Sequence, residues 1–343
     1  MSTCFKIPRR RQFGIGLIEV MVASAIAGVL IVGAVTVYSD SRATYTTHET
    51  SSRLEESGRY VLSVIEPDVR MASYWGLLQG PLYLSGASSQ TAVAATALAG
   101  SSASVCGTNY SVDLTTSLEG SNDGYTLGCQ ALNNRPMPSA DTLTVRRSSY
   151  TASTVPATTT GALRVCSQRL SAALVKLVNG SASCPPPPFG LVGDMIVHAY
   201  YVDQDSSTTA NLPTLFRKSL NSTPTFVDEE ILQGVEDLQV QFGIDPLGNT
   251  GIVTQYIDPL TAANLPVDAQ VISVRIWVLL RADSQEQGFT DNRTYAYANR
   301  QIANGVVASL TAGGAAGKAY RPADKYRRLL VSRTIMIRNA LGT

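Results

Sequence analysis

The sequence predicts an α+β protein in which a long N-terminal helix packs on a C-terminal antiparallel β-sheet. An apolar run over residues 13–38 leads into a stretch with helical periodicity. After residue 190, strand-like segments are joined by connections that are too short and turn-rich for helical crossovers. Between them, residues 80–185 are rich in Ser, Thr, Ala and Gly, which predicts a loop-rich insertion.

Composition supports a folded chain and argues against a nucleic-acid-binding protein. The 44% apolar content of the 343 residues is ample for a buried core. Charged residues make up only 15%, and the formal net charge is +1. This balance gives no bulk attraction to nucleic acid or to anionic lipid.

Residues 15–38 form an apolar segment long enough to cross a membrane as a helix. The basic residues before it, Lys6 and Arg9 to Arg11, orient that end toward the cytoplasm and place the following chain outside. An ordinary secretory signal is the competing interpretation, but no A-x-A-like site closes the run. We therefore expect a single transmembrane helix with a head outside the membrane.

Residues 39–76 continue this helix as an amphipathic half that lies on the head. Apolar or small residues recur at helical spacing on one face, at Leu54, Gly58, Val61, Ile65, Val69 and Ala72. We expect the helix to reach about Tyr74, with a kink or a restart at Pro67, which removes one backbone hydrogen bond. Residues 77–343 then form the globular head.

The cysteines predict disulfide bonds in the insertion. Cys4 lies before the apolar run, and the other four cysteines lie within residues 80–185 of an exported chain, which favours two disulfides over a metal site. Three pairings are possible. We favour Cys106–Cys129 and Cys166–Cys184, because each closes a short loop.

The C-terminal half predicts an antiparallel sheet. The expected strands, with two shorter ones in the insertion, are Leu143–Val145, Leu163–Cys166, Met195–Val202, Leu215–Lys218, Leu238–Phe242, Val271–Leu280 and Leu329–Ile337. Residues 229–235 are expected to form a short helix or turn.

No catalytic or metal-binding constellation is evident. His48 and His198 have no carboxylate or cysteine at metal-ligand spacing, so both are expected to be solvated or packed. The loop at residues 313–318 lacks the first glycine and the Ser/Thr of a phosphate-binding loop. Turn chemistry accounts for the acidic residues at 203–205 and 245–249. We therefore expect no catalytic residues, no metal and no cofactor.

The C-terminal segment is basic, which raises the alternative of a DNA-binding filament subunit. Its cations are Lys318, Arg321, Lys325, Arg327, Arg328, Arg333 and Arg338, against Asp324 alone. Few aromatic residues are interleaved with them, so a solvated strand face or a protein contact is the favoured interpretation.

Glu19 is the one charge within the apolar helix. A carboxylate in lipid costs up to about 2.5–3.5 kcal/mol near a helix centre and less near its end, so it requires a partner. Cleavage after Gly14 would give Ile15 a free α-amino group one helical turn from Glu19. In a bundle of parallel helices the carboxylate could equally neutralise a neighbour's amine, which would align the helices in register.

The N-terminal sequence resembles the class III signal of type IV pilins and type II secretion pseudopilins. The matching residues are Arg10-Arg11-Gln12-Phe13-Gly14 and Ile15-Gly16-Leu17-Ile18-Glu19-Val20. Isoleucine stands at the first mature position, where phenylalanine is usual. Further segments resemble PilW-type minor pilins, namely residues 54–60, 68–76, 234–245, 271–275 and 333–339.

This resemblance implies a type IV pilin fold and a role in filament assembly. Residues 1–14 would be a leader that a prepilin peptidase removes between Gly14 and Ile15, with N-methylation of Ile15 and Glu19 as the register carboxylate. The implied partners are other minor pilins, the major pilin, the inner-membrane assembly platform and a tip adhesin. The implied location is the inner membrane and then the pilus tip.

Two alternatives remain open at this point. One is a minor pseudopilin of type II secretion, of the GspJ-like kind. The other is a membrane-tethered periplasmic enzyme or binding domain that uses the helix only as an anchor.

Overall fold

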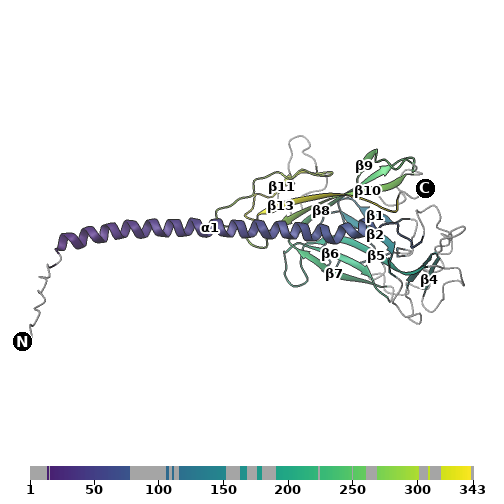
Figure 1. Cartoon of the computed structure of the whole chain (residues 1–343), viewed down its shortest axis with the longest axis horizontal. Helices are drawn as coiled ribbons and strands as arrows, with labels where there is room; N and C mark the ends of the chain where they lie inside the picture. The colour runs from purple at the N-terminus through teal and green to yellow at the C-terminus, as the bar shows by residue number, and fades with distance from the viewer. Residues whose placement is uncertain are drawn as a thin grey trace, which may run out of the picture. The chain divides into compact units, whose positions relative to one another are not determined.

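The computed structural model contains one long helix followed by antiparallel sheets (Figure 1). It describes residues 14, 16–77, 106–107, 110–111, 116–151, 163–167, 176–179, 191–222, 225–248, 250–259, 269–300, 308–309 and 318–340. The chain divides into two compact units, Met1–Thr50 and Ser51–Thr343. The α+β prediction is confirmed.

The helix α1, Leu17–Arg70, is continuous over 54 residues. Its expected end at Tyr74 is wrong, because the chain leaves the helix at Arg70 and Ser73 adopts a left-handed φ of 62°. The expected restart of the helix after Pro67 is also wrong, since α1 continues through this residue. Pro67 lies in the final turn, and Ile65, Asp68 and Val69 on either side of it are buried against the head.

In the second unit, seven of the described strands form one antiparallel sheet. Its path is β1-β2-β5-β3-β4, and β6 pairs with β5 and with β7. The bounds are β1 Leu118–Ser121, β2 Thr142–Ser148, β3 Leu163–Ser167, β4 Lys176–Asn179, β5 Leu191–Asp203, β6 Thr214–Leu220 and β7 Phe226–Gln233. Strands β1 to β4 come from residues 80–185, so this stretch builds part of the sheet and is more than a loop-rich insertion.

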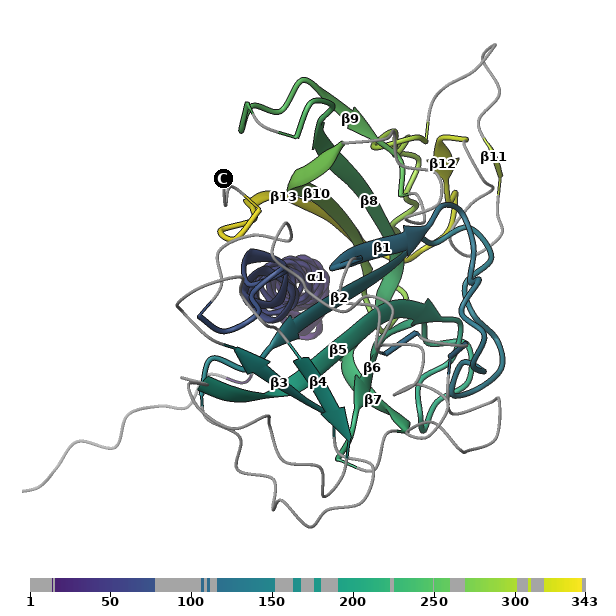
Figure 2. The ribbon, with the colours of Figure 1, turned by 90° about the vertical axis from the view of Figure 1, so that its right-hand side faces the viewer.

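A four-stranded antiparallel sheet has the order β13-β10-β8-β9. Its strands are β8 Val235–Asp245, β9 Gln255–Ile257, β10 Gln270–Arg281 and β13 Arg328–Met336. A short parallel pair joins β11 Ala308–Ser309 to β12 Tyr320–Arg321. Figure 2 looks along α1 and shows strands of the two larger sheets on either side of its C-terminal turns.

The apolar stripe of residues 54–72 forms the helical side of the main core. Every predicted stripe residue is buried. Gly58 lies so close to β13 that an added Cβ would be 2.8 Å from Val331 Cγ1. The sheet side of the core comes from alternating residues such as Val240, Val274 and Ile276. The amphipathic prediction is therefore confirmed.

For one segment, the predicted type of secondary structure is wrong. Residues 229–235 were expected as a short helix or turn, but β7 and β8 cover this stretch with Gly234 between them. Arg217 and Lys218 on β6 bind Glu229 and Asp228 on β7, so the acidic run is accommodated by cross-strand ion pairs.

Candidate functional site

The start of α1 places Glu19 where it can satisfy the helix's own backbone. The Gly16 carbonyl accepts the first helical bond, from Val20 N at 3.3 Å. The Glu19 carboxylate reaches back and accepts from Gly16 N–H at 3.1 Å. A carboxylate here caps a free donor and also interacts favourably with the positive end of the helix dipole.

Gly14, on the expected cleavage bond, is exposed. Its partner Ile15 lies outside the described residues.

The first half of α1 is predominantly apolar, and its side chains are exposed. The most apolar 18-residue stretch of this helix has a mean hydropathy of 2.5, and none of that stretch is buried. Leu17, for example, is 81% exposed. By length and composition this helix could cross a membrane. Its internal hydroxyls are satisfied locally, because Ser24 and Thr36 donate to the carbonyls of Met21 and Gly33.

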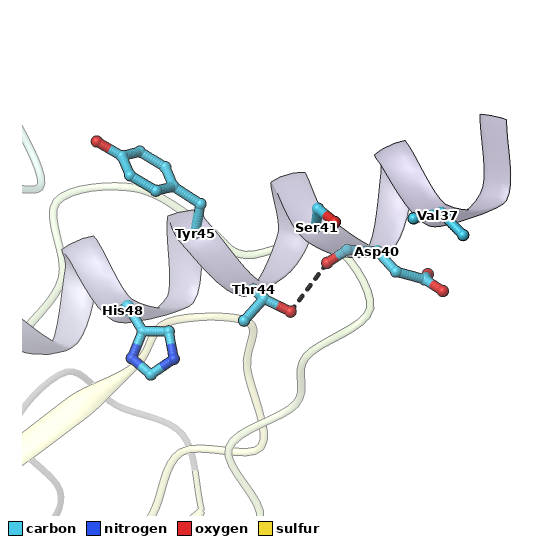
Figure 3. A pocket seen from close by; sticks show the side chains of 6 residues that line it. All are labelled: Val37, Asp40, Ser41, Thr44, Tyr45 and His48. Atoms are coloured by element: carbon cyan, nitrogen blue, oxygen red, sulfur yellow. Dashed lines mark hydrogen bonds between the residues drawn. The ribbon is translucent and has the colours of Figure 1, made fainter. Parts of the chain in front are cut away.

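A shallow depression lies on the next turns of the helix, where the side chains become polar. It is lined by Val37, Asp40, Ser41, Thr44, Tyr45 and His48, all from α1 (Figure 3). The Thr44 hydroxyl donates to the Asp40 carbonyl at 2.9 Å, and His48 is exposed. These side chains stand separately along one helix face, which is a solvated surface and offers no acid–base pair.

The last turns of α1 carry a buried carboxylate that anchors the helix to the large sheet. Asp68 Oδ1 lies 2.9 Å from Arg147 Nη2 on β2. Its Oδ2 lies 2.5 Å from both His198 Nδ1 and the Tyr200 hydroxyl on β5. One carboxylate thus joins two strands to the helix.

The electrostatics of this anchor follow from burial and from these partners. Burial alone would raise the pKa of Asp68, but the hydrogen bonds from His198, Tyr200 and Arg147 and the charge of His198 outweigh it. The pKa of Asp68 therefore lies well below its usual range. Burial and the neighbouring Asp68 charge raise the pKa of Tyr200 well above its usual value, so Tyr200 remains a donor.

The Asp68 anchor was not predicted from the sequence. His198 was expected to be solvated or packed, and it is packed against this carboxylate. A signal did exist: Asp68 lies three residues after Ile65 and four before Ala72, which places it on the buried face of the helix. An acid in that position requires partners from the head.

The basic C-terminal segment is largely tied into the head. The side chain of Arg328 is fully buried, 2.5 Å from Glu236 and 2.6 Å from Asp324. Arg327 pairs with Glu286 at 2.9 Å. The expectation of a solvated strand face is therefore wrong for Arg328. The exposed cations of the segment are Lys318, Arg321, Lys325, Arg333 and Arg338.

The acidic turns behave as expected. The carboxylate of Asp245 accepts from the backbone N–H groups of Leu247, Thr250 and Gly251. The carboxylate of Asp205 accepts hydrogen bonds from the Arg135 guanidinium and from the backbone N–H of Asn211. Among the described residues, no group of three or more His, Cys, Asp or Glu side chains could hold a metal ion. Of the rejected phosphate loop, only Lys318 is described.

A disulfide joins Cys106 to Cys129, which confirms that pairing. Both cysteines are buried in a cluster with Trp75, directly after the end of α1. Cys166 is also disulfide-bonded. Its expected partner, Cys184, lies outside the described residues.

Comparison with known proteins identifies both ends of the chain. Residues 199–339 match the family model of the Type IV Pilus-assembly protein W, PilW. Residues 9–35 match the prokaryotic N-terminal methylation motif, which includes Gly14, Ile15 and Glu19. The PilW match begins inside β5 and ends beyond β13, so it contains Tyr200 but excludes His198.

A search of solved structures matches a type IV-like pilin from Thermus thermophilus at 12% identity and a TM-score of 0.36. The match covers 85% of this chain and 98% of that one. No curated protein sequence matches the chain. The chain thus carries the N-terminal methylation motif over residues 9–35 and resembles the PilW-type type IV pilins over residues 199–339.

Proposed function

We propose that this chain is a minor pilin that helps initiate type IV pilus assembly as a non-catalytic subunit of a tip complex. One observation carries the proposal: the apolar half of α1 is exposed on all sides and bears a single carboxylate in its first turn. Such a surface requires lipid or other apolar helices around it. A subunit that moves from membrane to filament meets both in turn.

Processing at the N-terminus would prepare this helix for assembly. The prepilin peptidase would cleave between Gly14 and Ile15 and methylate the new amine of Ile15. Glu19 would then neutralise that amine or the amine of a neighbouring subunit. The geometry supports this role, because the Glu19 carboxylate already faces back toward the start of its own helix, at Gly16 N–H.

The partners would be other pilins of the same system. These comprise further minor pilins and the major pilin, together with the prepilin peptidase, the inner-membrane assembly platform and a tip adhesin. The head would lie on the periplasmic side of the inner membrane before assembly and at the pilus tip afterwards. Pilins are generally structural proteins, which agrees with the solvated helix face around His48 and with the packed setting of His198.

The test is complementation of a deletion strain with the wild-type chain or Glu19→Ala. We expect the deletion to reduce surface fibres and twitching motility, and the wild-type chain to restore both. Glu19→Ala should be processed and inserted into the membrane normally but fail to restore fibres, as counted by electron microscopy. Normal fibre counts in this variant would contradict the role assigned to Glu19.

Two further measurements separate the alternatives. Mass spectrometry of the mature protein should find N-methylated Ile15 at its start, whereas an intact leader would indicate a plain membrane anchor. Export of type II secretion substrates should continue in the deletion strain. Lost export with normal fibres would assign the chain to the secretion system instead.

A further inference from the structure

Strand β13 forms an outer edge of the four-stranded sheet. It pairs with β10 in a continuous antiparallel register from Arg328 to Met336, without a bulge. Among the described strands, none pairs with its other side. Ser332, Arg333, Thr334 and Met336 are exposed.

The register shows which backbone groups of β13 face outward. Ile337 N–H donates to the Ile272 carbonyl at 3.0 Å, so these two residues form a hydrogen-bonded pair. In an antiparallel ladder such pairs alternate with pairs that direct their groups away from each other. Arg333 and Ile335 therefore bond toward β10, while Ser332, Thr334 and Met336 direct N–H and C=O away from it.

The two ends of this edge are occupied, but its centre is open. The outward carbonyl of Arg328 accepts from Arg293 Nη2 at 2.8 Å. The outward N–H of Arg338 donates to the Arg70 carbonyl at the end of α1, at 3.1 Å. Within the described part of the chain, nothing bonds to the outward groups of Ser332, Thr334 and Met336 between these points.

Two other edge strands of the head, β7 and β9, carry the protection that natural sheets use against pairing with another chain. Strand β7 has three consecutive acidic residues, 228–230, and a register shift against β6. Strand β9 is only three residues long. Strand β13 is nine residues long, has no proline, and carries one charge, Arg333, in its open stretch.

The charges around the open stretch favour an acidic partner. Glu66 is the carboxylate that serves both Arg70 and Arg333, the latter at 3.1 Å. Arg338 is exposed nearby. Antiparallel pairing with a second copy of β13 would bring two Arg333 side chains to neighbouring positions, which is unfavourable. A strand with a carboxylate opposite Arg333 would instead complete the charge balance.

We propose that β13, over residues 330–336, is a docking edge that accepts an extended, carboxylate-bearing strand from the head of a different pilin subunit. The partner strand would bond to the outward groups of Ser332, Thr334 and Met336, as in other cases of strand addition. This inference rests on the proposed function, because it assigns a surface through which the head would meet its neighbour.

The test is photo-crosslinking in pilus-producing cells that carry the full-length chain with a photoreactive residue at position 332. We expect an adduct with another pilin, mapped to a strand that contains a carboxylate. Thr334→Pro removes an outward N–H and should lower the adduct yield by about tenfold or more, whereas Thr334→Val keeps the N–H and should retain it. The same residue at Leu247, in the loop between β8 and β9, should give no such adduct.

A second variant guards against misfolding of Thr334→Pro. Arg333→Glu keeps every backbone donor but reverses the charge, and it should also lower the yield. If the melting temperature of Thr334→Pro falls well below that of Thr334→Val, the adduct yield of Arg333→Glu is used to test the proposal instead.

An adduct that persists in Thr334→Pro with an unchanged melting temperature, or in Arg333→Glu, would overturn the proposal. An adduct with a second copy of this chain would also overturn it. The absence of any adduct in cells with normal fibres would do the same. The fibre count of the deletion strain reports on the proposed function independently.

Discussion

The two halves of α1 have the same backbone but opposite side-chain chemistry. Over residues 17–38 the side chains are predominantly apolar, and they are exposed around the whole helix. Over residues 51–70 the buried residues are confined to one face, which packs into the core of the head. The apolar surface of the first half therefore remains accessible to other molecules, while that of the second half is buried when the head folds.

The same contrast applies to the carboxylates at the two ends of the helix. Glu19 lies in the first turn, where the helix dipole favours a negative charge and a backbone donor is free. Asp68 lies in the last turn, where the dipole disfavours it, and it is 5% exposed. Three side chains from the sheet compensate the charge of Asp68, so its role is structural, whereas the role that we propose for Glu19 lies between subunits.

The largest effect on stability is expected for Asp68→Ala. This change removes a buried carboxylate and leaves the partly buried Arg147 without its partner, and breaking a buried ion pair typically costs about 3–5 kcal/mol. Urea unfolding of the full-length protein in detergent, followed by fluorescence that includes the buried Trp75, would measure it. Glu56→Ala, on the exposed face of the same helix, is the matched control and should change stability by less than about 0.5 kcal/mol. Equal effects of the two variants would contradict the anchor.

A packing comparison should give the next largest effect. Ile65→Ala leaves a cavity in the core of the head and should cost about 3 kcal/mol. The matched change Ile31→Ala lies in the exposed half of α1, where the side chain is 63% exposed, and should leave unfolding of the head unchanged. Loss of stability in Ile31→Ala would show that the apolar half contributes to the fold of the head.

Acid should weaken the Asp68 anchor. The pKa of Asp68 is lower in the folded than in the unfolded state, so its contribution is fully present above about pH 4–5 and is lost as pH falls through the folded pKa. The difference in unfolding free energy between the wild type and Asp68→Asn should therefore shrink between roughly pH 5 and pH 2. A difference that grows on acidification would reverse the sign assigned here.

Local pattern was enough to predict the helix and most of the strands. The spacing from Leu54 to Ala72 predicted the buried face, and the alternation over residues 271–280 predicted β10 within one residue at each end. These features depend on neighbours a few residues apart. The methylation motif around Glu19 is also local, which is why the N-terminal site could be identified from the sequence.

The sequence could not predict contacts between distant segments. Asp68 is 79 residues from Arg147 and 130 from His198, so only the folded chain brings them together. The stretch 229–235 was mistaken for a helix or turn because acidic residues are depleted in strands, and the compensating cations on β6 could not be placed. Burial of Arg328 was missed for the same reason, since its partner Glu236 lies 92 residues away.

The smallest effect on stability, with the largest on function, is expected for Glu19→Ala. The variant loses a capping contact at the exposed start of α1, so the unfolding free energy of the head should change by less than about 0.5 kcal/mol. Fibre counts should nevertheless fall sharply, while Asp68→Ala should reduce fibres only as far as it reduces folded protein. Measuring head unfolding and fibre number on both variants separates the two roles. If Glu19→Ala destabilised the head as much as Asp68→Ala does, the carboxylates at the two ends of the helix would share one structural function, and an assembly role for Glu19 would lose its support.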